Sequence, residues 1–381
     1  MNADLKIAGG TIIDPERGIS TQGDVLIRGN TVVEAAAGEA TDVATTIDAR
    51  GCFVLPGLID FHAHLYAGGT ESGVHADSAL LPMGVTTAVD AGSCGSANYE
   101  SFVRTAVVSS QVRIFSFINI SPGGLICTRY AEQLDPQYYD EPRIAELFHR
   151  YRGQCLGLKM RLSKEIVGSL GTTPLDRTLQ IAERLGCSVT VHTTNPPIPP
   201  EKIAGMLRPG DVYCHMYQGV GDTILGSDGK VRAGLYEARR RGVIFDSANG
   251  RNNFSFRVAQ AALAEGFPPD IISSDLTKKT LFSDFVFSLP FTMMKFLKLG
   301  MPIERVVAAA TSVPARQIGM QGKLGTLAPG AFADVAIFRR VKKQPLVVKD
   351  DSGDSIIVED WLIPQITILN GRIAYRQIDF Q

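Results

Sequence analysis

The strongest constraint on the fold is an alternation between short apolar segments and helical segments that fills the middle of the chain. Helical patterns at 175–185, 234–241 and 258–265 each stop at a glycine, a residue that readily ends a helix. Strands that alternate with helices indicate a parallel sheet, so we predict an α/β fold of the (β/α)₈ TIM barrel type. The eight candidate strands are 53–58, 86–90, 114–120, 157–160, 188–192, 212–214, 243–246 and 271–273.

The two ends of the chain have a different pattern, in which short apolar runs alternate with turn residues. The runs 5–8, 11–13 and 25–27 are followed by turn signals, and 366–369 precedes Asn370-Gly371, a strong hairpin signal. Because the 381 residues exceed the roughly 250 of a barrel, we expect both ends to share one small β-sandwich. The expected division is 1–55 and 321–381 for the two parts of the sandwich and 56–320 for the barrel.

Charge and composition argue against several classes of function. A formal net charge of −1 provides no broad cationic field, so we expect no nucleic-acid partner. No signal peptide pattern opens the chain and no apolar run approaches the roughly 18 residues of a membrane span, so we expect a cytoplasmic protein without a membrane partner. The six cysteines lack any CxxC pair, which indicates reduced thiols.

Residue types that bind metals stand at the ends of several candidate strands. His62 and His64 are two residues apart at the end of the first strand, so both imidazoles can face the same side. His192, His215 and Asp275 follow three later strands, and barrel enzymes draw their catalytic residues from such strand ends. One HxH pair is weak, but the series predicts a metal site. A helix N-cap is the alternative role for Asp275.

Lys159 ends another short strand and belongs to the same series. An ammonium beside two dications would be strongly repelled. If the amine reacts with carbon dioxide, the carbamate becomes an anionic ligand that can bridge two ions. A lysine whose head reaches solvent is the ordinary alternative.

The segment 56–64, together with this lysine and the later histidines and aspartate, resembles the metal motif of the amidohydrolase superfamily, and the lysine resembles its dihydroorotase-like branch. The resemblance implies a barrel enzyme with two divalent cations, for which we expect zinc, and an N6-carboxylysine at Lys159. It implies three ligands for the more buried ion, two for the more exposed ion, and a bridge formed by the modified lysine and a hydroxide. The ligands of the more buried ion would be His62, His64 and Asp275, and those of the more exposed ion would be His192 and His215. The bridging lysine would be Lys159.

Within that branch, the segments 192–197, 215–219 and 246–251 resemble a subgroup of deacetylases, some of which hydrolyse acetyl esters of α-hydroxy acids such as acetyl-(R)-mandelate. The implied function is a metal-dependent hydrolase that cleaves an acyl, in particular an acetyl, ester or amide of a small carboxylated substrate. The bridging hydroxide would attack, and Asp275 would act as general acid and base.

Substrate selection is expected from the loops above the same strand ends. Arg161 and Arg251 could each bind a substrate carboxylate, although each could equally pair with an acidic neighbour. The candidate substrate-binding residues are Ser93, Cys94, Asn119, Arg161, Tyr217, Asn249 and Arg251.

Other functions remain open on the sequence alone. The same metal centre could hydrolyse a cyclic amide, as in dihydroorotase or hydantoinase, or an N-acyl amino acid. A non-catalytic scaffold barrel is a more remote alternative, because all six ligand positions carry suitable residues. A mononuclear deaminase would use a glutamate near the metal histidines, but no His-x-x-Glu follows His215. A homo-oligomer is allowed, since relatives often form one, although no interface pattern is visible.

Overall fold

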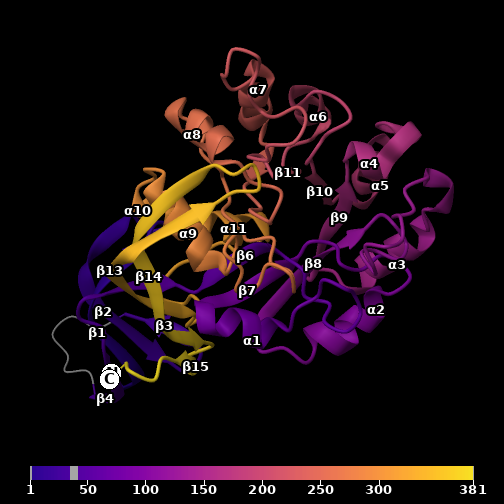
Figure 1. The fold of residues 1–381 in the computed structure, drawn as a ribbon. Helices are drawn as coiled ribbons and strands as arrows, with labels where there is room; N and C mark the ends of the chain where they lie inside the picture. Colours follow the sequence, from indigo (N-terminus) through magenta and orange to yellow (C-terminus); the bar gives the residue numbers. More distant parts are fainter. Residues whose placement is uncertain (1, 35–41, 381) are drawn as a thin grey trace.

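The computed structural model describes residues 2–34 and 42–380. Its strands form two sheets, one parallel sheet of seven strands and one sheet of eight strands built from both chain ends (Figure 1). The first sheet carries the candidate metal ligands. The second lies beside it, with indigo N-terminal strands next to yellow C-terminal strands.

The seven strands of the parallel sheet pair in chain order. Most of their residues are buried on both faces, which is why the sequence shows apolar runs rather than an alternation. The strands are β6 (Leu58–Ala63), β7 (Val85–Asp90), β8 (Arg113–Asn119), β9 (Cys155–Arg161), β10 (Ser188–His192), β11 (Val212–Cys214) and β12 (Ile244–Asp246).

An irregular segment takes the eighth position and closes the barrel. Ile271 forms a parallel bridge with Asp246 of β12, and Leu276 forms one with Ala63 of β6. On the β6 side, the backbone N–H of Asp275 also donates to the carbonyl of His62 at 2.7 Å. The predicted eighth strand at 271–273 therefore occupies the expected place, and the (β/α)₈ barrel is confirmed.

The three predicted helices correspond to α5, α7 and α8. The first two end at Gly186 and Gly242, whose φ values of 64° and 100° place them in the left-handed region that favours glycine. The helices are α1 (Ala76–Leu80), α2 (Tyr99–Phe102), α3 (Glu141–Arg150), α4 (Lys164–Val167), α5 (Thr173–Leu185), α6 (Pro200–Met206), α7 (Ala233–Arg241), α8 (Phe256–Ala264), α9 (Leu289–Lys298), α10 (Ile303–Ala309) and α11 (Ser312–Gln317).

The second sheet runs β15-β14-β13-β5-β1-β2-β3, and β4 also pairs with β1. The two chain ends meet where β5 pairs antiparallel with β13. Ile7, Ile27, Val54, Ile337 and Ile366 pack in its buried core. The strands are β1 (Asn2–Asp14), β2 (Ile19–Arg28), β3 (Thr31–Val33), β4 (Asp42–Asp48), β5 (Cys52–Pro56), β13 (Val335–Lys349), β14 (Ser355–Leu369) and β15 (Arg372–Arg376).

The first predicted barrel strand, 53–58, was wrong. Residues up to Pro56 belong to β5 of the second sheet, and the barrel strand β6 begins at Leu58. Gly57 lies between them, where a Cβ atom would stand 2.3 Å from Oγ1 of Thr86. Only glycine fits at this crossing, and a continuous apolar pattern hides the change of sheet.

No helix in the described part of the chain combines the length and apolar composition needed to cross a lipid bilayer.

Candidate metal centre

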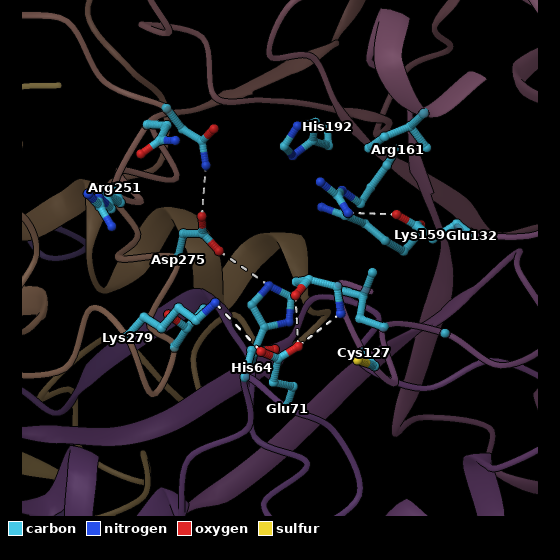
Figure 2. A pocket seen from close by; sticks show the side chains of 18 of the residues that line it. His64, Glu71, Cys127, Glu132, Lys159, Arg161, His192, Arg251, Asp275 and Lys279 are labelled. Atoms are coloured by element: carbon cyan, nitrogen blue, oxygen red, sulfur yellow. Dashed lines mark hydrogen bonds and ion pairs between the residues drawn. The ribbon is translucent and has the colours of Figure 1, made fainter. Parts of the chain in front are cut away.

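A cavity of about 620 Å³ opens at the carboxyl end of the barrel strands (Figure 2). All six residues predicted as metal ligands line it, and they come from β6, β9, β10, the turn after β11 and the closing segment. They are His62, His64, Lys159, His192, His215 and Asp275.

Asp275 lies closest to His62 of β6 and to His64, which follows this strand. Its Oδ1 is 3.2 Å from Nε2 of His64 and 3.6 Å from Nε2 of His62, and these three residues could hold a metal ion. Burial raises the pKa of the carboxyl group, but the hydrogen bond with His64 and the nearby histidines outweigh it and hold the pKa below its usual range. The residue is therefore an anion at neutral pH, which suits it to bind a cation.

Three of the four histidines in the cavity are held in the neutral form that binds metals. Burial, with the charges of neighbours, lowers the pKa of His62 and His192 and lowers that of His215 to about 3. The rings of His192 and His215 are 4.3 Å apart between centroids.

In His215 and His64, a contact at Nδ1 fixes the orientation of the ring and so the position of Nε2, the nitrogen that could bind a metal. Nδ1 of His215 bonds the carbonyl of Ala248 at 2.7 Å and so carries the hydrogen, which leaves a buried Nε2 without a partner among the described residues. Nδ1 of His64 lies 2.9 Å from Oγ of Ser93. A buried nitrogen lone pair without a partner fits a divalent cation.

Lys159 points into the same cluster rather than to solvent. The residue is 1% exposed and its Nζ lies 3.5 Å from Nε2 of His62. Gly92 makes room for it, because a Cβ atom there would stand 2.4 Å from Cβ of Lys159. A carbamate on this lysine would place an anionic ligand among neutral imidazoles, so the donor set fits a pair of cations.

Two of the candidate ligands have strained backbones. His215 has φ 62° and Asp275 has φ 52°, in the left-handed region that non-glycine residues rarely adopt. Each such residue costs on the order of 1–3 kcal/mol, and strain of this kind gathers at functional sites. The chain tolerates it where it turns the ligands toward the cavity.

Asp246 lies beside His62, and the sequence did not single it out as a site residue. Its Oδ2 lies 3.7 Å from Nδ1 of His62, while Oδ1 accepts the hydroxyl of Ser273 at 2.7 Å. Burial raises the pKa of this carboxyl to about 6. Carboxylates behind metal-binding histidines orient the ring. The sequence signal that could have identified Asp246 is its position at the end of β12, because a position at the end of a strand also identified the candidate ligands.

The two predicted arginines line the same cavity as the candidate ligands. Nη1 of Arg161 lies 2.6 Å from Oε1 of Glu132, an ion pair drawn in Figure 2. The guanidinium of Arg251 stands 5.6 Å from the ring centre of Phe285. Arg251 has no ion-pair partner among the residues that the structure describes, so it is the more available cation.

Five predicted substrate-binding residues do not line the cavity in the described structure: Ser93, Cys94, Asn119, Tyr217 and Asn249. Of these, Ser93 lies behind a candidate metal ligand, with its Oγ 2.9 Å from Nδ1 of His64. Cys94 is fully buried, and burial raises the pKa of its thiol. Asn119 donates to the carbonyl of Gly92 at 3.1 Å and accepts from the N–H of Ser121 at 2.9 Å. Its amide stabilises the loop backbone.

Tyr217 and Asn249 also direct their polar groups to partners inside the protein. The hydroxyl of Tyr217 donates to the carbonyl of Phe267 at 2.8 Å, and Oδ1 of Asn249 accepts from Nζ of Lys295 at 3.3 Å. Loops that fold back over the barrel turn polar side chains toward backbone groups that water cannot reach. Residue type and position in a loop did not predict this direction.

Comparison with known proteins agrees with this geometry. The profile described as Amidohydrolase family matches residues 293–375. A deacetylase from Agrobacterium fabrum is 35% identical over 337 residues, which cover 87% of this chain and 81% of that protein.

Two solved structures are similar along nearly the whole chain. A crystal structure of an adenine deaminase superposes with a TM-score of 0.89 at 26% identity, covering 98% of this chain and 100% of that one. A crystal structure of a dihydroorotase superposes with a TM-score of 0.82 at 31% identity, covering 99% and 98%. The chain is a hydrolase of the amidohydrolase superfamily and belongs to its deacetylase subgroup.

Proposed function

We propose that the protein is a binuclear metal-dependent hydrolase that removes an acyl group, first of all acetyl, from an ester or amide of a small carboxylated substrate. The observation that carries the proposal is the convergence of four histidines, Asp275 and Lys159 on the floor of one cavity beneath two arginines. The similarity to deacetylases supports the acetyl group.

In this proposal His62, His64 and Asp275 would hold one zinc ion, and His192 and His215 would hold the other. Lys159 would complete the ligand set as a carbamate, which forms when its amine adds carbon dioxide and releases a proton. Two divalent cations supply an activated water and polarise the scissile carbonyl.

The residues of the chain perform the remaining steps. Asp275 is buried and anionic, so it accepts the proton released as the acyl carbon is attacked and passes it to the leaving oxygen or nitrogen. Arg251 binds the substrate carboxylate, because a guanidinium without an acidic partner is matched to that anion. Arg161 is partly neutralised by Glu132 and orients the other end of the substrate.

The proposal is tested by turnover of purified enzyme supplemented with zinc and bicarbonate. The panel is acetyl esters of α-hydroxy acids, N-acetyl amino acids, dihydroorotate and adenine, with metal content measured on the same preparation. Hydrolysis of the open-chain acetyl compounds with about two zinc ions per chain is the expected result. Turnover of the cyclic amide or the purine alone, or less than one bound metal ion, would contradict it.

A second candidate is deamination of a purine, which the superposition with an adenine deaminase favours. The charged lining of the cavity, which includes Glu71, Glu132, Arg161 and Arg251, suits a carboxylated substrate better than a neutral ring. Ammonia release from adenine in the same panel distinguishes the two. A cytoplasmic location and assembly as a homo-oligomer remain predictions.

A further inference from the structure

The two carboxylate oxygens of Asp275 have different neighbours. Oδ1 faces His62 and His64, whereas Oδ2 accepts a hydrogen bond of 2.9 Å from Nδ2 of Asn253. Asn253 lies in the loop between β12 and α8, and no motif in the sequence singled it out. One oxygen is thus directed at the candidate metal site, and the other is held by an amide.

The amide of Asn253 has only one favourable orientation. Its Oδ1 accepts the hydroxyl of Thr194 at 2.7 Å, so its Nδ2 points at Asp275. A flipped amide would place a carbonyl oxygen against a carboxylate, which is repulsive. Thr194 is itself fixed, because its carbonyl accepts the hydroxyl of Ser163 at 2.7 Å. The contact therefore connects the loops after β9, β10 and β12 to the segment that closes the barrel.

Gly250 allows this contact to form. Its φ is +53°, and a Cβ atom at this position would stand 2.4 Å from Oδ2 of Asp275 and 2.5 Å from Nδ2 of Asn253. Any side chain would push the amide and the carboxylate apart. Its backbone N–H donates to the carbonyl of Ser274 at 3.0 Å, which fixes the loop beside Asp275.

We infer that Asn253 is a positioning residue that locks the Asp275 carboxylate with Oδ1 toward His62 and His64, and that Thr194 acts through it. Where the inference concerns turnover it rests on the proposed function. Where it concerns the orientation of a metal ligand, it rests on the contacts alone. Residues that orient metal ligands typically change metal affinity or activity by about 10- to 100-fold when removed.

The test compares Asn253→Ala and Asn253→Asp with the unmodified enzyme. Asn253→Asp keeps the size of the side chain, so it protects the test against a loss of fold, but it turns an anion toward Asp275. For both we expect kcat to fall about 10- to 100-fold with KM changed less than about threefold, and zinc affinity, measured by competition with a chelator, to fall about tenfold or more. The visible spectrum of the cobalt-substituted protein should change as well.

Asn252→Ala is the matched control, because the neighbouring asparagine makes no side-chain hydrogen bond within the described residues. It should leave kcat, zinc affinity and the cobalt spectrum unchanged. If Asn253→Ala and Asn253→Asp also leave kcat and zinc affinity within about twofold and the cobalt spectrum unchanged, the inference is wrong, whatever substrate the enzyme turns over.

Thr194→Val tests the second half of the inference. Alone it should cause a smaller loss in the same direction, and in the Asn253→Ala background it should cause none, since the effect passes through the missing amide. Losses that add in the double variant would contradict the role of Thr194. If no acyl substrate is turned over at all, the proposed function fails, while zinc affinity and the cobalt spectrum still test the contact.

Discussion

The floor of the cavity, formed by the six candidate ligands, and its rim, formed by loop residues such as Glu71, Arg251 and Lys279, differ in how their residues are held. On the floor, Lys159 is 1% exposed and His215 is also 1% exposed. On the rim, Glu71 receives the backbone N–H and the hydroxyl of Thr128 at 2.9 and 2.8 Å, yet its side chain is 41% exposed and that of Lys279 is 63% exposed. Strand ends thus supply a rigid site for chemistry, and loops supply a softer surface for recognition.

The largest effect is expected on the floor, from Lys159→Ala. Without the bridging ligand we expect kcat/KM to fall about a thousandfold or more and zinc content to drop by about one equivalent, because stabilisation by the second ion is worth several kcal/mol. Turnover assays and metal analysis measure both. Lys164→Ala, at an exposed lysine of α4, is the control. Near-normal activity and metal content would show that the floor needs no carboxylated lysine.

Lys295 lies beneath the rim and links it to the core. The residue is 2% exposed, and its Nζ donates to Asn249 and to the carbonyl of Phe285. Burial lowers the pKa of this amine to about 7, although the charge of Asp350 acts in the opposite direction. Between this value and 10.5 the unfolded chain binds more protons, so the free energy of unfolding should rise with pH by at most about 1.4 kcal/mol per unit.

Lys295→Met should remove that contribution. Urea unfolding of both proteins at about pH 7.5 and about pH 9.5 gives the free energy of unfolding at each pH. The change in this free energy per pH unit is then compared between the two proteins. Equal slopes would mean that the lysine is protonated in the folded protein throughout, and that the rim is supported by an ion rather than a neutral amine.

A smaller effect is expected from Arg251→Met on the rim. Loss of a charge-assisted hydrogen bond should raise KM for a carboxylated acetyl ester about 10- to 100-fold and leave kcat nearly unchanged. The acetyl ester of the corresponding neutral alcohol serves as the internal control, since it has no carboxylate to lose. An equal rise in KM for both esters would assign the arginine a structural role and leave Arg161 as the carboxylate ligand.

The smallest effects are expected from Glu71→Ala and Lys279→Ala. Glu71 connects the loop after β6 to the loop after β8 through Thr128 and to Lys279 of the closing segment (Figure 2). We expect these exposed contacts together to contribute about 1 kcal/mol or less, so KM should change by about fivefold at most, with zinc content intact. Lys279→Ala should have a still smaller effect. A loss of zinc on Glu71→Ala would erase the distinction between floor and rim.

The floor could be predicted because its residues follow local rules. His62 and His64 face one side because side chains two apart on a strand do so, and Lys159 could be assigned from its place at the end of a strand. Arg161 and Arg251 were identified by charge alone. The rim contacts of Glu71, Glu132 and Asn253 left no such signal, because each depends on a loop far away in the sequence.

The sequence by itself determined the barrel, three of its helices and the residues gathered at the strand ends, since periodicity and residue type act over short stretches of chain. Tertiary structure decided which asparagines and tyrosines turn inward to satisfy loop backbone, where Gly57 passes between sheets, and how Asn253 meets Asp275. Those outcomes depend on which groups are nearby after folding. A buried amide or carbonyl takes whatever partner the fold brings within hydrogen-bond distance.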